Sequence, residues 1–230
     1  FIYNEAATGS LGQGLAIAAG MAINAKIDKL GYTTYVLLGD GELAEGSVWE
    51  AAEFASHNNL NNLIGIIDCN KLGQTGPTVC NGNTSYYSKK FKAFGWDTIE
   101  VDGHDIPKLL NAFESTNKTS NKPSIIVAKT LKGYGIESFE DKNGYHGKPI
   151  PKDQLNIILK QLEQRFNNIS KSADELILQI KFKDFIQPQK IQKSVVTKLK
   201  ITPDKESLEV SKKISTRKAF GQAMVALGSK

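Results

Sequence analysis

An aspartate and an asparagine, each placed shortly after an apolar run, are the residues of this sequence best suited to chemistry. Asp40 follows residues 35–38, and Asn70 follows residues 63–67 by three positions. A carboxylate and an amide oxygen are ligands that Mg²⁺ accepts, and Mg²⁺ fills its other positions with phosphate oxygens and water. The glycines on both sides of Asp40 let the backbone turn sharply and let a phosphate approach. The pattern therefore predicts a magnesium site that holds a phosphate-bearing cofactor, with a backbone carbonyl as a third ligand.

Two strands and a helix would position these two side chains. Residues 35–38 and 63–67 are short apolar runs rich in β-branched residues, which indicates buried parallel strands. Residues 45–58 between them are expected to form a helix whose apolar positions are Val48, Trp49, Ala52, Phe54 and Ala55. Ligands of open α/β sheets bind at the carboxyl ends of strands, so Asp40 and Asn70 should face one crevice. Taken alone, however, Gly-Asp-Gly is also a good turn, and an asparagine before a lysine is an ordinary loop.

The rest of the chain predicts more elements of the same α/β kind, a doubly wound and mainly parallel sheet with helices on both faces. Helices are expected at residues 15–30, 86–94, 106–116 and 152–166, and strands at residues 96–101 and 123–129. Thr8 or Ser10 could cap the first helix and Gly31 could end it, while Asp105 should cap the helix that starts at residue 106. Residues 152–166 are amphipathic, and the polar, Lys-rich stretch to residue 213 is typical of a helical or irregular linker.

Four segments in order give the chain a family resemblance. Residues 39–51 (Gly-Asp-Gly-Glu-Leu-Ala-Glu-Gly-Ser-Val-Trp-Glu-Ala) resemble the cofactor motif of transketolases, which use thiamine diphosphate. Residues 8–14 (Thr-Gly-Ser-Leu-Gly-Gln-Gly), residues 129–135 (Lys-Thr-Leu-Lys-Gly-Tyr-Gly) and residues 146–149 (His-Gly-Lys-Pro) are similar to further segments of that family. The resemblance is continuous from residue 8 to residue 151. It implies the thiamin-diphosphate-binding fold, with a diphosphate-binding domain at residues 1–151, a linker at 152–213 and the first helix of a pyrimidine-binding domain at 214–230.

The resemblance also implies roles for particular residues. It assigns Mg²⁺, for which Ca²⁺ or Mn²⁺ could substitute, to Asp40, Asn70 and the carbonyl of Leu72. Contact with thiamine diphosphate is implied for Gly9, Ser10, Leu11, Gly39, Asp40, Gly41, Glu42, Asn70, Gln74, Lys132 and His146. His146 would be the catalytic side chain, and His146, Lys148 and Arg217 would bind the sugar phosphate. Glu45 and Glu50 would belong to a network joining two active sites across a homodimer. By residue type alone, these acids, Lys132 and Arg217 could equally be solvated surface charges.

The function implied is transfer of a two-carbon ketol unit from a ketose phosphate to an aldose phosphate, in the pentose phosphate pathway. In this family a glutamate of the second domain activates the cofactor, and it would lie downstream of Lys230. We therefore expect the chain by itself to be inactive. Two alternatives remain open. One is another thiamin-diphosphate enzyme, such as deoxyxylulose-phosphate synthase or a 2-oxoacid dehydrogenase component. The other is a non-catalytic relative that binds the cofactor or supports a dimer.

Composition sets outer limits on these expectations. The 230 residues are 40% hydrophobic and 23% charged, as in ordinary globular proteins, and no apolar run is long enough to span a membrane. Two cysteines without a framework pattern indicate free thiols and a cytoplasmic location. The net charge is +5, with the basic excess after residue 147, but no nucleic-acid-binding motif accompanies it. Phe1 is neither an initiator methionine nor part of a signal peptide, so the chain is expected to lack its front.

Overall fold

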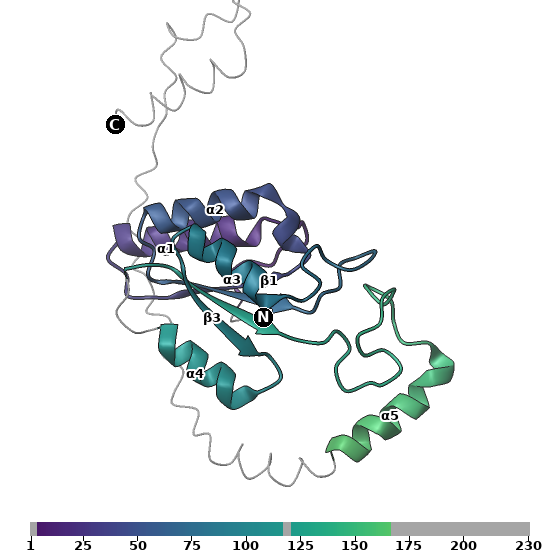
Figure 1. Cartoon of the computed structure of the whole chain (residues 1–230). Helices are drawn as coiled ribbons and strands as arrows, with labels where there is room; N and C mark the ends of the chain where they lie inside the picture. The colour runs from purple at the N-terminus through teal and green to yellow at the C-terminus, as the bar shows by residue number, and fades with distance from the viewer. Residues whose placement is uncertain (1–3, 117–120, 167–230) are drawn as a thin grey trace, which may run out of the picture. The chain divides into compact units, whose positions relative to one another are not determined.

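A computed structural model describes residues 4–116 and 121–166 of the chain (Figure 1). Arg217, most of the expected linker and the expected second domain lie outside the described residues. The strands are β1 (Thr34–Gly39), β2 (Leu63–Cys69), β3 (Asp97–Asp102) and β4 (Ser124–Lys129). They form one parallel sheet in the order β1-β2-β4-β3. The helices are α1 (Gly14–Ile27), the short 3₁₀ helix η1 (Glu42–Ala44), α2 (Gly46–His57), α3 (Thr84–Ala93), α4 (Ile106–Thr116) and α5 (Lys152–Phe166).

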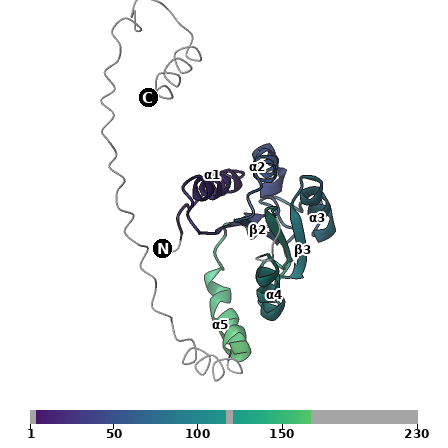
Figure 2. The ribbon, with the colours of Figure 1, turned by 90° about the vertical axis from the view of Figure 1, so that its left-hand side faces the viewer.

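Helices cover both faces of this sheet, which confirms the predicted doubly wound α/β fold. Helices α1, α2 and α3 lie over one face and α4 lies over the other, as Figures 1 and 2 show. The reason is the reversal of strand order after β3. Crossovers between parallel strands are right-handed, so a connection that moves back from β3 to β4 must pass over the opposite face.

The larger hydrophobic core lies under α1, α2 and α3. It contains alternate residues of β1, such as Val36 and Leu38, together with most of the apolar residues of β2. Trp96 is almost fully buried there, packs its ring against Phe91, and donates its indole hydrogen to the carbonyl of Ala52 on α2 at 2.9 Å. A smaller core lies under α4. None of the described helices combines the length and the apolar composition needed to cross a membrane.

Three local expectations were wrong in detail. Helix α1 ends at Ile27 rather than near Leu30, because Lys29 adopts a left-handed conformation (φ +54°) and the amide of Leu30 bonds back to the carbonyl of Ala25. Neither Thr8 nor Ser10 caps this helix, since its N-cap residue has no side-chain hydrogen bond. Phe54 is exposed on α2, and Ala51 takes the buried position instead.

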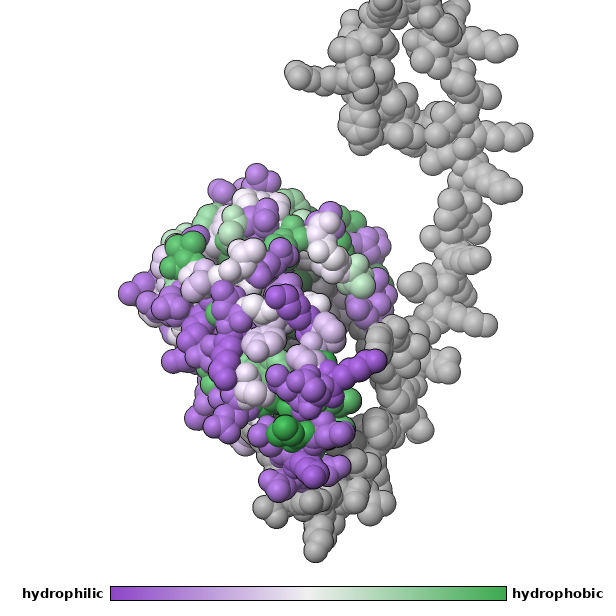
Figure 3. All heavy atoms as spheres, turned by 90° about the vertical axis from the view of Figure 1, so that its right-hand side faces the viewer, coloured by the Kyte–Doolittle hydropathy of each residue, from purple (hydrophilic) through white to green (hydrophobic). Residues whose placement is uncertain are grey.

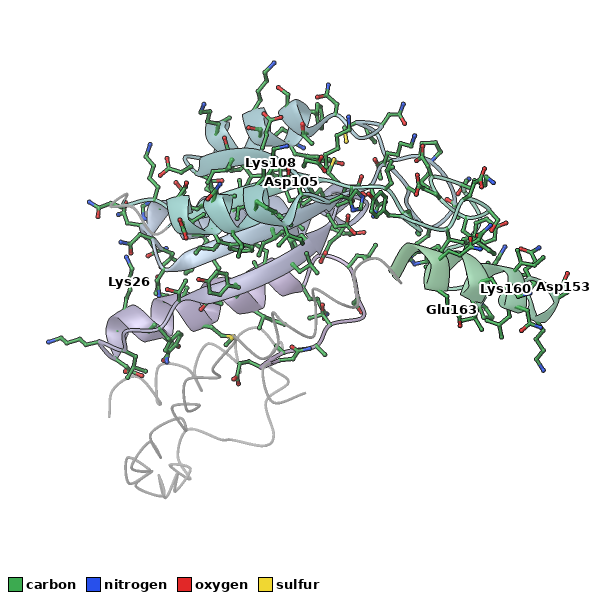
Figure 4. The ribbon with its side chains drawn as sticks, turned by 90° about the horizontal axis from the view of Figure 1, so that it is seen from below. Lys26, Asp105, Lys108, Asp153, Lys160 and Glu163 are labelled. Carbon is green, nitrogen blue, oxygen red and sulfur yellow. The ribbon has the colours of Figure 1, made fainter. Side chains whose placement is uncertain are left out.

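The Asp105 cap of α4 was predicted correctly. Its Oδ1 accepts the backbone hydrogen of Lys108 at 3.0 Å, and its Oδ2 lies 2.8 Å from the Lys108 ammonium (Figure 4). The hydrogen bond and charge of Lys108 lower the pKa of the Asp105 carboxyl.

Figure 4 also shows Asp153, Lys160 and Glu163 on α5. On that helix Ile158 is buried, whereas Leu155 and Leu159 remain exposed.

Replacement of Gly20 by alanine should stabilise the chain. Gly20 lies exposed in the middle of α1, and an added Cβ would meet nothing within 4 Å. Alanine favours the helix by about 1 kcal/mol relative to glycine, so thermal and urea unfolding should show a gain of that order. Gly65→Ala in β2 is the contrasting variant, because its Cβ would lie 2.4 Å from Cδ1 of Ile125. Equal effects of the two substitutions would contradict this reasoning.

Candidate active site at the carboxyl ends of the strands

Asp40 lies buried just beyond β1, at the edge of the sheet where all four strands end. Its Oδ2 accepts hydrogen bonds from the backbone amide of Lys71 at 2.8 Å and from the hydroxyl of Thr78 at 3.2 Å. Burial raises the pKa of the Asp40 carboxyl, and the charge of Asp68 acts in the same direction, while the hydrogen bonds from Lys71 and Thr78 oppose the shift. The Lys71 backbone amide and the Thr78 hydroxyl are neutral donors, so a cation beside Asp40 would relieve the penalty of its burial.

Asn70 and Leu72 lie in the loop that follows β2, next to Asp40. The amide nitrogen of Asn70 donates to Asp68 at 3.1 Å, and its Oδ1 accepts the backbone hydrogen of Leu72 at 3.0 Å. Lys71, between them, adopts a left-handed backbone (φ +62°) and directs its amide to Asp40. The loop is thereby fixed to the carboxylate, and the orientation of the Asn70 amide is set by two partners.

Glu42 connects the glycine-rich loop before α1 with the end of β1. Its carboxylate is buried and accepts the backbone hydrogens of Gly12 at 2.8 Å and of Gly39 at 3.3 Å. Ser47 completes the connection by donating to the carbonyl of Gly12 at 3.0 Å. Gly12 is held at φ +85°, where a Cβ would lie 2.4 Å from the Ser47 hydroxyl oxygen. Only glycine fits this position without displacing the loop.

Lys132 and His146, which lie 14 residues apart in the sequence, meet in the structure. The Lys132 ammonium lies 3.1 Å from Nδ1 of His146. An ammonium can only donate, so Nδ1 is the acceptor and the ring carries its hydrogen on Nε2. This leaves an N–H group of an exposed imidazole available to an oxygen atom of a substrate.

An ion pair attaches this lysine–histidine pair to the loop around Asn70. The ammonium of Lys71 lies 2.6 Å from a carboxylate oxygen of Asp141, whose backbone amide donates to the carbonyl of Lys132 at 2.8 Å. A second connection runs from the side chain of Asn143 to the carbonyl of Thr75 at 3.3 Å. The loop after β4 is therefore tied to the loop after β2.

Two pockets at this edge hold most of the residues predicted to contact a cofactor. One, of about 260 Å³, is lined by residues that include Gly9, Ser10, Leu11, Gly39 and Glu42. The other, of about 480 Å³, is lined by residues that include Asp40, Gly41 and Gln74. Figure 3 looks onto the side where the strands end, a largely hydrophilic surface with scattered hydrophobic side chains.

The side chains present fit a hard cation with a phosphate-bearing ligand. A carboxylate can accept about four hydrogen bonds or metal contacts, so the recorded bonds to Asp40 leave room for a metal ion. Asp40 supplies charge, Asn70 a neutral oxygen and the buried Leu72 a backbone carbonyl in the same short loop. This is the set of donors that Mg²⁺ takes when phosphate oxygens complete its coordination.

Other predicted residues are not brought into this arrangement. Glu45 and Glu50 are exposed on and just before α2, so their place in a dimer network stays a prediction. Lys148 is exposed, and Arg217 lies outside the described residues. His104, to which no role was given, stacks on Tyr134 at 3.6 Å and accepts the backbone hydrogen of Leu131. These contacts show that the ring of His104 finds its stacking and hydrogen-bond partners in the neighbouring loop after β4.

Sequence reasoning missed the residues that fix the site's geometry. Lys71, Thr78 and Asp141 bind site residues or their loops, and Asp68 accepts hydrogen bonds from Asn70 and Thr130. Nothing in their spacing predicted these contacts, because the partners lie up to 70 residues apart.

Burial also raises the pKa of the Cys69 thiol at the end of β2 to about 12, so the free thiol is protonated at neutral pH.

The fold and the site define a class of protein, the diphosphate-binding domains of thiamin-dependent enzymes. Residues 3–171 match the family described as "Transketolase, thiamine diphosphate binding domain". The chain belongs to the transketolase family.

Individual relatives agree with this assignment. The chain is 44% identical to human transketolase-like protein 2 over 229 residues and 44% identical to human transketolase over 227 residues, covering 97% and 98% of this chain. It spans about a third of each relative, 34% in both cases. Among solved structures, a Pichia stipitis transketolase mutant in complex with xylulose 5-phosphate superposes with a TM-score of 0.59 and 31% identity. That match covers 70% of this chain and 25% of the other.

Proposed function

We propose that the chain binds thiamine diphosphate through Mg²⁺ and serves the two-carbon ketol transfer of transketolases between sugar phosphates. The observation that carries the proposal is the buried Asp40 carboxylate, which faces neutral donors and is tied by Lys71 to the Asn70 loop. Membership of the transketolase family supports it. Residues 1–151 would be the diphosphate-binding domain, followed by a linker to residue 213 and the start of a pyrimidine-binding domain.

In this proposal the first set of residues binds and orients the cofactor. Asp40, Asn70 and the carbonyl of Leu72 would hold Mg²⁺, and the glycines around Asp40 would let the diphosphate approach. The cofactor-binding site would be lined by Gly9, Ser10, Leu11, Glu42 and Gln74. Bound thiamine diphosphate would supply the carbon nucleophile and the electron sink that ketol transfer needs. Because Glu42 accepts hydrogen bonds from both Gly12 and Gly39, it would hold the glycine-rich loop and the end of β1 together around the cofactor.

A second set of residues would act on the substrate. The hydrogen bond from Lys132 fixes the proton of His146 on Nε2, so the imidazole can donate to oxygen atoms on which charge develops. The ammonium of Lys132 adds positive charge beside the imidazole and would attract the diphosphate of the cofactor. Lys148 and Arg217 would bind the phosphate of the sugar. Glu45 and Glu50, exposed in the single chain, would contact a second copy in a cytoplasmic homodimer.

Loss of the Asn70 amide should weaken the cofactor site without unfolding the chain. We expect Asn70→Ala to reduce the Mg²⁺-dependent affinity for thiamine diphosphate about 10- to 100-fold, measured by calorimetry with and without Mg²⁺, because a metal ligand and its orientation are lost together. Asn61→Ala, an exposed asparagine before β2, is the matched control and should bind like the parent chain. Equal binding to a folded chain in the absence of any divalent cation would overturn the proposed metal role.

Ketol transfer itself is tested in a protein that joins this chain to the pyrimidine-binding domain of a transketolase. Loaded with thiamine diphosphate and Mg²⁺, it should consume xylulose 5-phosphate when ribose 5-phosphate is present as the acceptor. Consumption of pyruvate and not of the ketose phosphate would favour the alternative thiamin enzymes instead.

A further inference from the structure

The two cysteines of the sequence meet at the buried side of Asp40. Cys69 is the last residue of β2 and is 1% exposed, while Cys80 is half-buried in the loop between β2 and α3. The two Sγ atoms and a carboxylate oxygen of Asp40 all lie within 4.8 Å of one another. In the part of the chain that the structure describes, this is the one group of three such ligands so close together.

Two thiols and a carboxylate form a donor set for a thiophilic metal ion. Zn²⁺ binds thiolate sulfur at about 2.3 Å and carboxylate oxygen at about 2.0–2.2 Å, which places tetrahedral ligands about 3.5–3.8 Å from one another. Atoms already within 4.8 Å would need to move by about 1 Å to reach that geometry. Mg²⁺ prefers oxygen ligands, so the sulfur atoms distinguish this set from the magnesium site.

The carboxylate of this group borders a pocket that opens to solvent. Thr78 lies beside the set, with its hydroxyl 3.2 Å from Asp40 Oδ2 and 3.8 Å from Cys80 Sγ. Asp40, Thr78 and Tyr87 line the pocket of about 480 Å³, which opens to solvent. Three protein ligands leave a fourth position for water or for the Thr78 hydroxyl, as in open zinc sites.

We propose that Asp40, Cys69 and Cys80 bind one thiophilic divalent cation such as Zn²⁺, and that this binding withdraws Asp40 from the magnesium site. The metal displaces one proton from each thiol, and both protons pass to solvent. The second half of the proposal rests on the proposed cofactor function, since it makes the thiophilic metal an inhibitor of thiamine diphosphate binding. The metal site stands independently of that function.

Cobalt is the probe for the site, because Co²⁺ bound to thiolates is coloured. Titration of the reduced 230-residue chain with Co²⁺ should give a sulfur-to-cobalt charge-transfer band and tetrahedral d–d bands that saturate at one equivalent and disappear when Zn²⁺ is added. Cys80→Ser should weaken Zn²⁺ binding at least about 100-fold, since a direct ligand is lost. Cys80 is half-buried, so this variant should fold, which circular dichroism will verify. Cys69→Ala is the second variant and tests the other proposed sulfur ligand in the same titration.

His57→Gln is the matched control, because His57 is an exposed metal-binding type of side chain at the end of α2. It should keep the parent spectrum and stoichiometry. The absence of a thiolate band in the folded parent chain, or bands that persist in both cysteine variants, would overturn the site.

A competition experiment separates this proposal from the proposed function. Thiamine diphosphate and Mg²⁺ are titrated into the chain with and without one equivalent of Zn²⁺; Zn²⁺ should suppress binding in the parent chain but not in Cys80→Ser. A zinc-selective chelator should restore cofactor binding in the parent chain. If cofactor binding persists while the cobalt experiment shows an occupied site, the competition is refuted. If the parent chain binds no cofactor at all, the proposed function fails and the cobalt result alone decides the metal site.

Discussion

Replacing Asp40 by asparagine is expected to weaken Mg²⁺-dependent binding of thiamine diphosphate by more than about 100-fold. This loss should exceed that of a residue that only orients a ligand, because the one carboxylate assigned to the metal disappears. The shape of the site should survive, since an asparagine oxygen can still accept the hydrogen bonds from Lys71 and Thr78. Calorimetric titration of cofactor at fixed Mg²⁺ measures the effect.

The same substitution should not destabilise the cofactor-free chain. Burial raises the pKa of the Asp40 carboxyl in the folded state, so the folded chain binds a proton more readily than the unfolded chain at this group. Ionised Asp40 therefore opposes folding above its folded-state pKa, and that penalty is relieved as the pH falls through this value. Asp40→Asn removes the penalty, and its melting temperature at neutral pH should equal or exceed that of the parent chain.

The matched control is Asp102→Asn, an exposed aspartate at the end of β3. It should leave both cofactor affinity and the pH dependence of melting unchanged. Full cofactor affinity in Asp40→Asn would refute the metal assignment, and a large loss of stability would show that the carboxylate is needed for folding instead.

Gly12→Ala should be the most destabilising change in the glycine-rich loop, by about 2–5 kcal/mol in the free energy of unfolding. A non-glycine residue at φ +85° costs about 1–2 kcal/mol. The added Cβ would also lie 2.4 Å from Oγ of Ser47 and 2.8 Å from Cβ of Glu45, and such overpacking costs about 1–3 kcal/mol. Urea unfolding measures the sum.

Relief of that clash would also move the loop. Because the amide of Gly12 donates to Glu42, its displacement should weaken cofactor binding even in the fraction of protein that stays folded. Gly9→Ala is the control for stability, since its Cβ would meet nothing within 4 Å. If the two variants unfolded at the same urea concentration, the close contact at Gly12 would not be real.

Local sequence patterns determined the secondary structure and the edge of the sheet that carries the site. Short runs of β-branched residues between turn residues placed all four strands within two residues of their observed bounds, because strand formation depends on local composition and burial. The positions of Asp40 and Asn70 just beyond strand ends then followed from parallel pairing. The meeting of Lys132 and His146 came from family resemblance and not from spacing.

Only the tertiary structure decided which faces are covered and which distant side chains meet. The position of β4 between β2 and β3 placed α4 on the face opposite α1, α2 and α3, and the packing of α2 left the apolar side chain of Phe54 exposed. The ion pair of Lys71 with Asp141 joins two loops, and the Asp40 carboxylate lies within 4.8 Å of the thiols of Cys69, at the end of β2, and of Cys80 in the next loop. Local pattern contains no information on such pairs, because their proximity depends on strand order and loop conformation, which the packing of the whole sheet determines.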